Sequence, residues 1–124
     1  MLLSDIGDYL ETEGVGVVHV DIFKGMMPDQ PDNCTSLFEY AGKPPDLHWD
    51  GEYPGLQVRV RNKSYEAGRI KIDSIYKTLH GLNEQTLGTT RYLLIKSNGS
   101  PESIGRDKND RVEFVCNFSV IKER

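Results

Sequence analysis

The sequence predicts an α+β fold: a single domain over residues 1–124, with two helices packed on one face of a mostly antiparallel sheet of about five strands. Three observations lead to this prediction. Apolar residues recur at helical spacing in two segments, they alternate with polar residues in two others, and the segments follow the order helix, strands, helix, strands. A chain of 124 residues is also long enough for one hydrophobic core.

The first 33 residues predict a helix, a strand and a loop. Apolar residues at helical spacing indicate a helix from Leu2 to Leu10, and Gly14 is placed to end it in the left-handed conformation. The segment from Val15 to Phe23 is rich in Val and Ile, which favour a strand. Residues 26–33 contain two prolines and two aspartates, so we expect an ordered loop.

The middle of the chain predicts two strands separated by a long loop. The first strand runs from Cys34 to Tyr40, and residues 41–54 form the longest irregular connection. Aromatic residues in this connection favour an ordered, functional loop. From Leu56 to Arg61 apolar residues alternate with polar ones, so one face belongs to the core and the other carries Gln57, Arg59 and Arg61.

The second helix is expected between Ser64, a suitable N-cap, and Gly81, which follows its last turn. Gly68 lies on its apolar stripe, where it either permits close approach to a sheet or is a tolerated weak position costing about 1 kcal/mol relative to Ala. The whole stripe consists of Tyr65, Gly68, Ile72, Ile75, Tyr76 and Leu79.

Two further strands are expected at residues 91–96 and 111–121, joined by a polar loop. If both helices cover one face of the sheet, Val115, Ile121 and Leu94 make the other face partly apolar, which commonly marks an oligomer contact. Cys34 and Cys116 are expected to be buried free thiols rather than a disulfide framework.

Composition and motifs argue against most catalytic functions. The net charge of −4 disfavours a protein whose main task is binding nucleic acid, and no nucleotide-binding or hydrolase motif is present. Asp46, His48 and Asp50 alternate in a way that could hold a divalent metal, but the spacing matches no known signature, and a solvated acidic loop anchored by Trp49 is the favoured interpretation. We therefore expect no catalytic residue, metal or cofactor.

A basic cluster provides the second alternative. Four cationic residues within eleven positions could contact a phosphate backbone, or they could pair with the acidic residues nearby. These residues are Arg59, Arg61, Lys63 and Arg69.

Three segments resemble a family of bacteriophage minor capsid proteins that act as tail terminators or head–tail joining subunits. They are Met27-Pro28-Asp29-Gln30-Pro31-Asp32-Asn33-Cys34, the run from Tyr53 to Arg61, and Gly105-Arg106-Asp107 with the later Asn117-Phe118. The resemblance implies a structural virion protein that is not an enzyme. It implies a homo-oligomeric ring, expected to be a hexamer, that caps the tail tube and links it to the head connector.

The resemblance also implies the partners and the location. The partners would be the tail-tube protein, a head-connector or head-completion protein, and DNA that passes through the ring without specific binding. No membrane partner is expected, and the protein would occupy the virion, or the host cytoplasm during assembly. The alternatives are a nucleic-acid-binding accessory protein of phage assembly and, less favoured, a small metal-dependent enzyme.

A ring of identical subunits needs two different, complementary patches on each subunit. The acidic, aromatic loop and the arginine-bearing strand face are the predicted patches, because aromatic anchors and opposite charges are typical of interfaces. The expected interface residues are Asp46, His48, Trp49, Asp50, Tyr53, Arg59 and Arg61.

Overall fold

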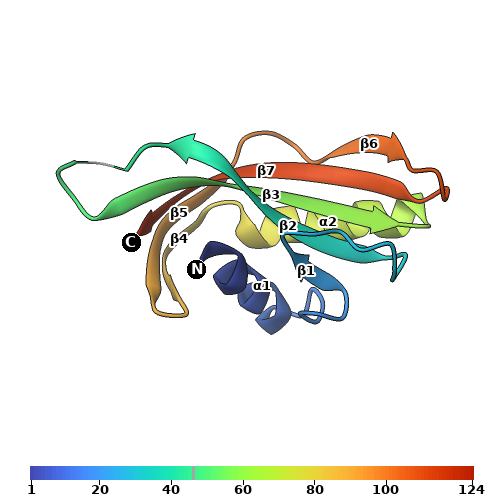
Figure 1. The fold of residues 1–124 in the computed structure, drawn as a ribbon, viewed down its shortest axis with the longest axis horizontal. Coiled ribbons are helices and arrows are strands. Elements are labelled where there is room, and N and C mark those ends of the chain that lie inside the picture. The colour runs from blue at the N-terminus through green and yellow to red at the C-terminus, as the bar shows by residue number, and fades with distance from the viewer. Residues whose placement is uncertain (46) are drawn as a thin grey trace.

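A sheet bends around two helices in the computed structural model, which describes residues 1–45 and 47–124 (Figure 1). Helices and strands follow one another in the predicted α+β order. The elements are α1 (Leu2–Thr12), β1 (Ile22–Lys24), β2 (Cys34–Lys43), β3 (Gly51–Asn62), α2 (Tyr65–Leu79), β4 (Leu82–Leu87), β5 (Thr90–Ser97), β6 (Glu102–Arg106) and β7 (Val112–Glu123).

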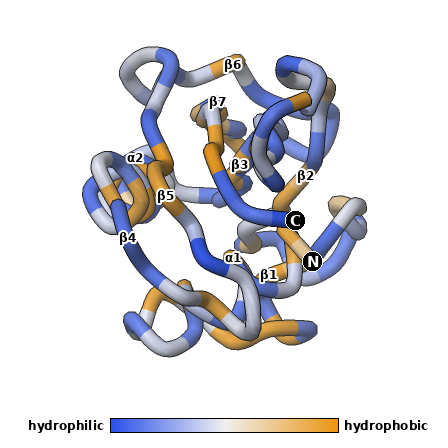
Figure 2. The backbone as a smooth tube through the Cα atoms, turned by 90° about the vertical axis from the view of Figure 1, so that its left-hand side faces the viewer, coloured by the Kyte–Doolittle hydropathy of each residue, from blue (hydrophilic) through white to orange (hydrophobic). Residues whose placement is uncertain are grey.

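The sheet has seven strands in the described residues, more than the five expected. Its order is β1-β2-β3-β7-β5-β4, and β6 pairs with the part of β7 that β5 does not reach. Only β1 and β2 are parallel, so the sheet is mostly antiparallel, as predicted. The end-on view in Figure 2 shows an open curl with β2 and β4 on opposite sides.

Both helices pack inside this curl, which confirms that they share one face of the sheet. Helix α1 contacts β1, β2 and β4, while α2 contacts β3, β5 and β7. Ile6 and Leu10 of α1 and Ile75 of α2 are completely buried in one continuous hydrophobic core. None of the described helices is long and apolar enough to span a membrane.

The predicted helix signals are confirmed. The hydroxyl of Ser64 accepts a hydrogen bond from the backbone N–H of Ala67 at 3.2 Å, and Gly14 and Gly81 have φ angles of 78° and 83°. At Gly68 an added Cβ would lie 2.6 Å from Cε2 of Phe114, so the absence of a side chain permits close helix–sheet packing. Two residues of the predicted stripe depart from full burial: Tyr76 is half-buried, and Tyr65 is 49% exposed.

The prediction of a strand from Val15 to Phe23 was wrong for most of these residues. The carbonyl of Val17 accepts hydrogen bonds from the N–H groups of Val20, Asp21 and Ile22, which closes a turn. The carboxylate of Asp21 also accepts a hydrogen bond from the N–H of Val17 at 2.6 Å. Such local side-chain bonds compete with strand pairing, and β1 starts only at Ile22.

The long irregular connection predicted at residues 41–54 was also wrong in extent. Strand β2 continues to Lys43 through a bulge, and β3 begins at Gly51, so only residues 44–50 join them. We call the hairpin from Tyr40 to Gly55 the arm. Figure 1 shows that the arm projects at one end of the long axis, opposite the loop that leads into β2.

Candidate assembly surfaces

The loop of residues 25–33 is held by two buried arginines, which we call the arginine clamp. Arg61, near the end of β3, is only 4% exposed. Its Nε donates to the carbonyl of Asp32 at 3.0 Å, and its Nη2 donates to the carbonyls of Pro28 and Pro31 at 2.6 and 2.8 Å. A rigid guanidinium fork satisfied by backbone carbonyls fixes the path of this loop.

The second arginine of the clamp binds carboxylates. Arg111, just before β7, is 3% exposed and forms ion pairs with Asp107 at 2.8 Å, Asp29 at 2.9 Å and Asp32 at 3.2 Å. Segments far apart in the sequence therefore meet at one end of the molecule: residues 28–32, the end of β3 and the turn before β7. Each coincides with one of the three segments that carry the family resemblance.

The clamp makes stability depend on pH. The Asp107 carboxylate accepts hydrogen bonds from the backbone N–H of Arg111, from the Arg111 side chain and from the backbone N–H of Asn109. These bonds, the first most strongly, lower the pKa of Asp107, although partial burial acts in the opposite direction. A folded-state pKa below the unfolded value of about 3.9 adds stability above that pH. This stability is lost as the pH falls through the lowered pKa.

We expect Asp107→Asn to lower the thermal midpoint at pH 7 and to have a smaller effect in acid. The difference narrows below about pH 4, because the unfolded chain then binds a proton at Asp107, and it disappears once the pH falls through the lowered pKa of the folded protein, where the folded carboxyl is protonated as well. Thermal unfolding followed by circular dichroism at pH 7 and in acid measures both differences. The control is Asp110→Asn, since the Asp110 side chain is 87% exposed; a difference at Asp107 that does not change with pH would contradict the prediction.

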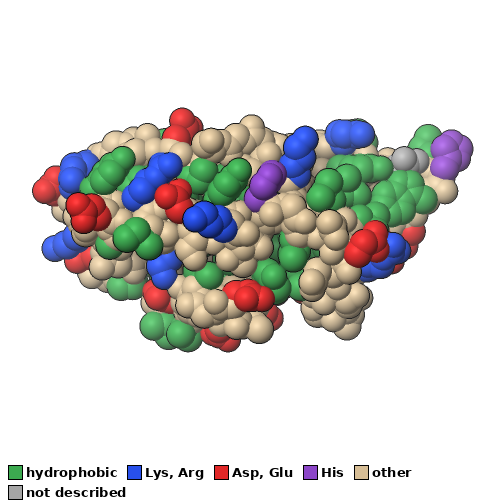
Figure 3. All heavy atoms as spheres, turned by 180° about the vertical axis from the view of Figure 1, so that it is seen from behind, with side chains coloured by type: hydrophobic (Ala, Val, Ile, Leu, Met, Phe, Trp, Pro, Cys, Tyr) green, Lys and Arg blue, Asp and Glu red, His purple; other side chains and the backbone are tan. Residues whose placement is uncertain are grey.

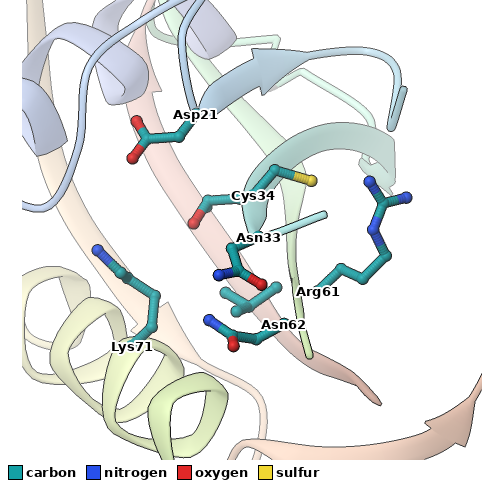
Figure 4. Close-up of a pocket in the computed structure, with 8 residues that line it drawn as sticks. Asp21, Asn33, Cys34, Arg61, Asn62 and Lys71 are labelled. Carbon is teal, nitrogen blue, oxygen red and sulfur yellow. The ribbon is translucent and has the colours of Figure 1, made fainter. Parts of the chain in front are cut away.

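A cavity of about 170 Å³ adjoins the clamp (Figure 4). Lys71 extends into it from α2 and donates a hydrogen bond to the carbonyl of Val15. Burial raises the pKa of the Cys34 thiol despite the nearby Arg61, so Cys34 is not an activated nucleophile. The described residues that line this cavity therefore include no activated cysteine.

The arm is the second candidate surface. The Trp49 ring packs against the backbone of Gly51, where an added Cβ would lie 2.0 Å from the ring, and its Nε1 donates to the Tyr53 hydroxyl at 3.2 Å. The two rings meet edge-on with centroids 6.3 Å apart, and the Lys43 ammonium lies 4.6 Å from the centroid of the Tyr53 ring. The absence of a side chain at Gly51 thus allows the Trp49 ring to pack against the hairpin.

The predicted interface residues fall into two groups. His48, Trp49, Asp50 and Tyr53 lie together on the arm, whereas Asp46 lies outside the described residues. The acidic charge is partly used within the chain, because Asp50 pairs with Arg124 at 3.7 Å. Intramolecular pairing of this kind reduces the charge available to a second subunit.

The expectation that Arg59 and Arg61 form one exposed face was wrong for Arg61, which is buried in the clamp. Arg59 is half-buried, and its Nε has no hydrogen-bond acceptor among the described residues. Strand alternation correctly turns both side chains away from the core, but the loop of residues 25–33 binds one of them.

The basic cluster is largely neutralised. Lys63 pairs with Asp32 at 3.4 Å and Arg69 with Asp73 at 3.5 Å, as the salt-bridge alternative predicted. With Arg61 also bound, three of the four cations have partners in the chain. The arrangement does not favour a nucleic-acid-binding surface.

Comparisons with known proteins give the family. A chain from the virion of a native gene transfer agent particle has a similar fold, with a TM-score of 0.77 and 13% identity, covering 99% of this chain and 95% of that chain. A comparison with curated proteins gives no match. The model of a family described as bacteriophage tail terminator protein matches residues 9–124. The chain belongs to this family.

Membership of the tail terminator family makes this chain a structural protein of the phage virion. The match begins within α1 and includes both the clamp and the arm. No cluster of three or more His, Cys, Asp or Glu side chains that could hold a metal occurs in the described part of the chain. The clamp and the arm are the features of this tail terminator that need a functional explanation.

Two residues of these surfaces were missed in the sequence. Tyr40 is the last residue of the strand predicted from Cys34, which in the structure continues to Lys43, and its position on Gly55 depends on the register of β2 against β3. Arg111 precedes β7, and its burial arises from Asp29 and Asp32 about 80 positions away. No local pattern contains either contact.

Proposed function

We propose that six copies of this chain form a closed ring that caps the finished tail tube and presents a surface to the head connector or a head-completion protein. The observation that carries the proposal is the projecting aromatic arm in a member of the tail terminator family. Tyr and Trp are the residues most often found at the centre of protein interfaces. A soluble single subunit would gain little from displaying them.

Closure of the ring explains termination. Contacts between two different patches build either a helical array that continues or a ring that ends growth. DNA would pass through this ring without specific binding, because the chain carries a net charge of −4 and affinity for DNA comes mainly from phosphate contacts.

We expect the double variant Trp49→Ala with Tyr53→Ala to fold and to lose ring formation on tail tubes. Both side chains lie on the arm outside the core cluster, whereas their loss removes the proposed anchors. Negative-stain imaging of tails from cells that produce the variant should show uncontrolled lengths and few joined heads.

The control for this experiment is Ile70→Ala, a 70% exposed position on α2, which should give normal tails. Normal tails from the double variant would remove the arm from the interface. Normal tails after complete deletion of the chain would refute the terminator function itself.

A further inference from the structure

The geometry points to a specific contact between copies: the side chain of Leu47, at the tip of one arm, inserts into a groove at the base of the next subunit's arm. This inference rests on the proposed ring and names the surfaces that join its subunits. We call the receiving surface the arm-base groove; it encloses about 420 Å³ and is lined by residues that include Tyr40, Pro54, Gly55, Asn98, Ser119 and Ile121.

The inserting group is unusually exposed. Leu47 is 94% exposed, more than any other large hydrophobic side chain of the described residues. Figure 3 shows hydrophobic side chains gathered over the end of the molecule that carries the tip between β2 and β3. An apolar side chain held in water at the end of a projecting hairpin gains free energy from any apolar site that accepts it.

The groove can accept such a side chain because the polar side chains of Tyr40, Asn98 and Ser119 already have partners. The Tyr40 hydroxyl donates to the carbonyl of Phe118 at 3.0 Å and accepts from Nδ2 of Asn98 at 3.0 Å. The Ser119 hydroxyl donates to Oδ1 of Asn98 at 2.8 Å. An apolar side chain that displaces water from the groove would therefore leave none of these polar atoms without a hydrogen bond.

The occupant that we infer is a second copy of the chain. Within its own subunit the Leu47 side chain is 94% exposed, so it does not fill the groove at the base of its own arm. Each subunit carries one tip and one groove, which are different surfaces. Repeating this contact gives the heterologous arrangement from which a ring closes.

Charge complements the shape. The tip segment from Pro44 to Asp50 contains two aspartates and no lysine or arginine. Lys96 of β5 pairs with Ser119 of β7, which lines the groove, and Lys43 of the arm lines the groove as well. Neither lysine forms an ion pair within residues 1–45 and 47–124. Lys43 and Lys96 therefore favour docking of the acidic tip segment, although one of its two aspartates, Asp50, already pairs with Arg124 of its own chain.

Disulfide trapping tests the contact. The double variant Leu47→Cys with Ile121→Cys places one thiol on the tip and one in the groove, while the native Cys34 and Cys116 are buried. Mild oxidation of tails isolated from producing cells should give a ladder of covalent oligomers on a non-reducing gel. The matched control, Leu47→Cys with Ile104→Cys, places the second thiol at an exposed position on β6 and should give no ladder.

A second variant separates this inference from the proposed function. Leu47→Asp should keep the thermal midpoint of the wild type and raise the concentration needed for ring assembly at least tenfold, whereas Ile104→Asp should change neither. Rings seen by imaging without a ladder in the Leu47/Ile121 pair, or normal assembly of Leu47→Asp, would overturn the tip-in-groove contact and leave the ring intact. Absence of rings from wild-type tails would overturn the proposed function instead.

Discussion

Arg61→Met is expected to lower the free energy of unfolding by about 3 kcal/mol. The guanidinium is buried and donates to several backbone carbonyls of the loop at residues 28–32. Methionine keeps most of the apolar volume but supplies no donor, so these carbonyls lose their partner and the loop loses its attachment. Urea unfolding followed by tryptophan fluorescence measures the loss.

Arg59→Met is the matched control. Arg59 lies on the same strand as Arg61 and is half-buried, but its Nε donates no hydrogen bond to any described residue. We expect it to change stability by less than about 1 kcal/mol. If the two variants were equally stable, the loop would not depend on Arg61.

Gly68→Val is expected to cost about 3 kcal/mol, near the upper end of the range for overpacked cores. Its Cβ alone would lie 2.6 Å from the Phe114 ring and 3.1 Å from Cβ of Asn62. Phe114 is fully buried, so it cannot move aside without disturbing β7. Thermal and urea unfolding measure the effect.

Gly7→Ala provides a control of opposite sign. Gly7 is also a buried helical glycine, but an added Cβ would meet its nearest neighbours at 3.7 Å, an ordinary contact. We expect a gain of about 0.5–1 kcal/mol from the higher helix propensity of alanine. Destabilisation at Gly7, or none at Gly68, would contradict this account of the helix–sheet contacts.

The helices and strands that were predicted correctly are those in which buried apolar residues recur at regular spacing in the sequence. Strands β3 and β7 each alternate buried and less buried residues, and α2 has both a capping serine and a terminal glycine. Strands β4 and β6 are almost entirely exposed, so no hydrophobic alternation marks them. Both strands form by backbone pairing with a neighbour, β4 with β5 and β6 with β7.

The candidate surfaces show a similar division. The aromatic character of the arm is visible in the sequence, because Trp49 and Tyr53 are close together. The clamp could not be predicted, since alternation indicates toward which face Arg61 points but not what covers that face. A loop some 30 positions earlier decides that, through bonds to Arg61 that have no sequence signature.

The arm and the clamp lie at opposite ends of the same strand, and this has a mechanical consequence. Strand β3 pairs with β7 from Gly51 opposite Glu123 to Asn62 opposite Val112, and with β2 on its other side. Hydrogen bonds in antiparallel pairs run perpendicular to the strands. Tension between a partner on the arm and another on the clamp loop would load these bonds in shear, so the strand would resist as a whole and not unzip pair by pair.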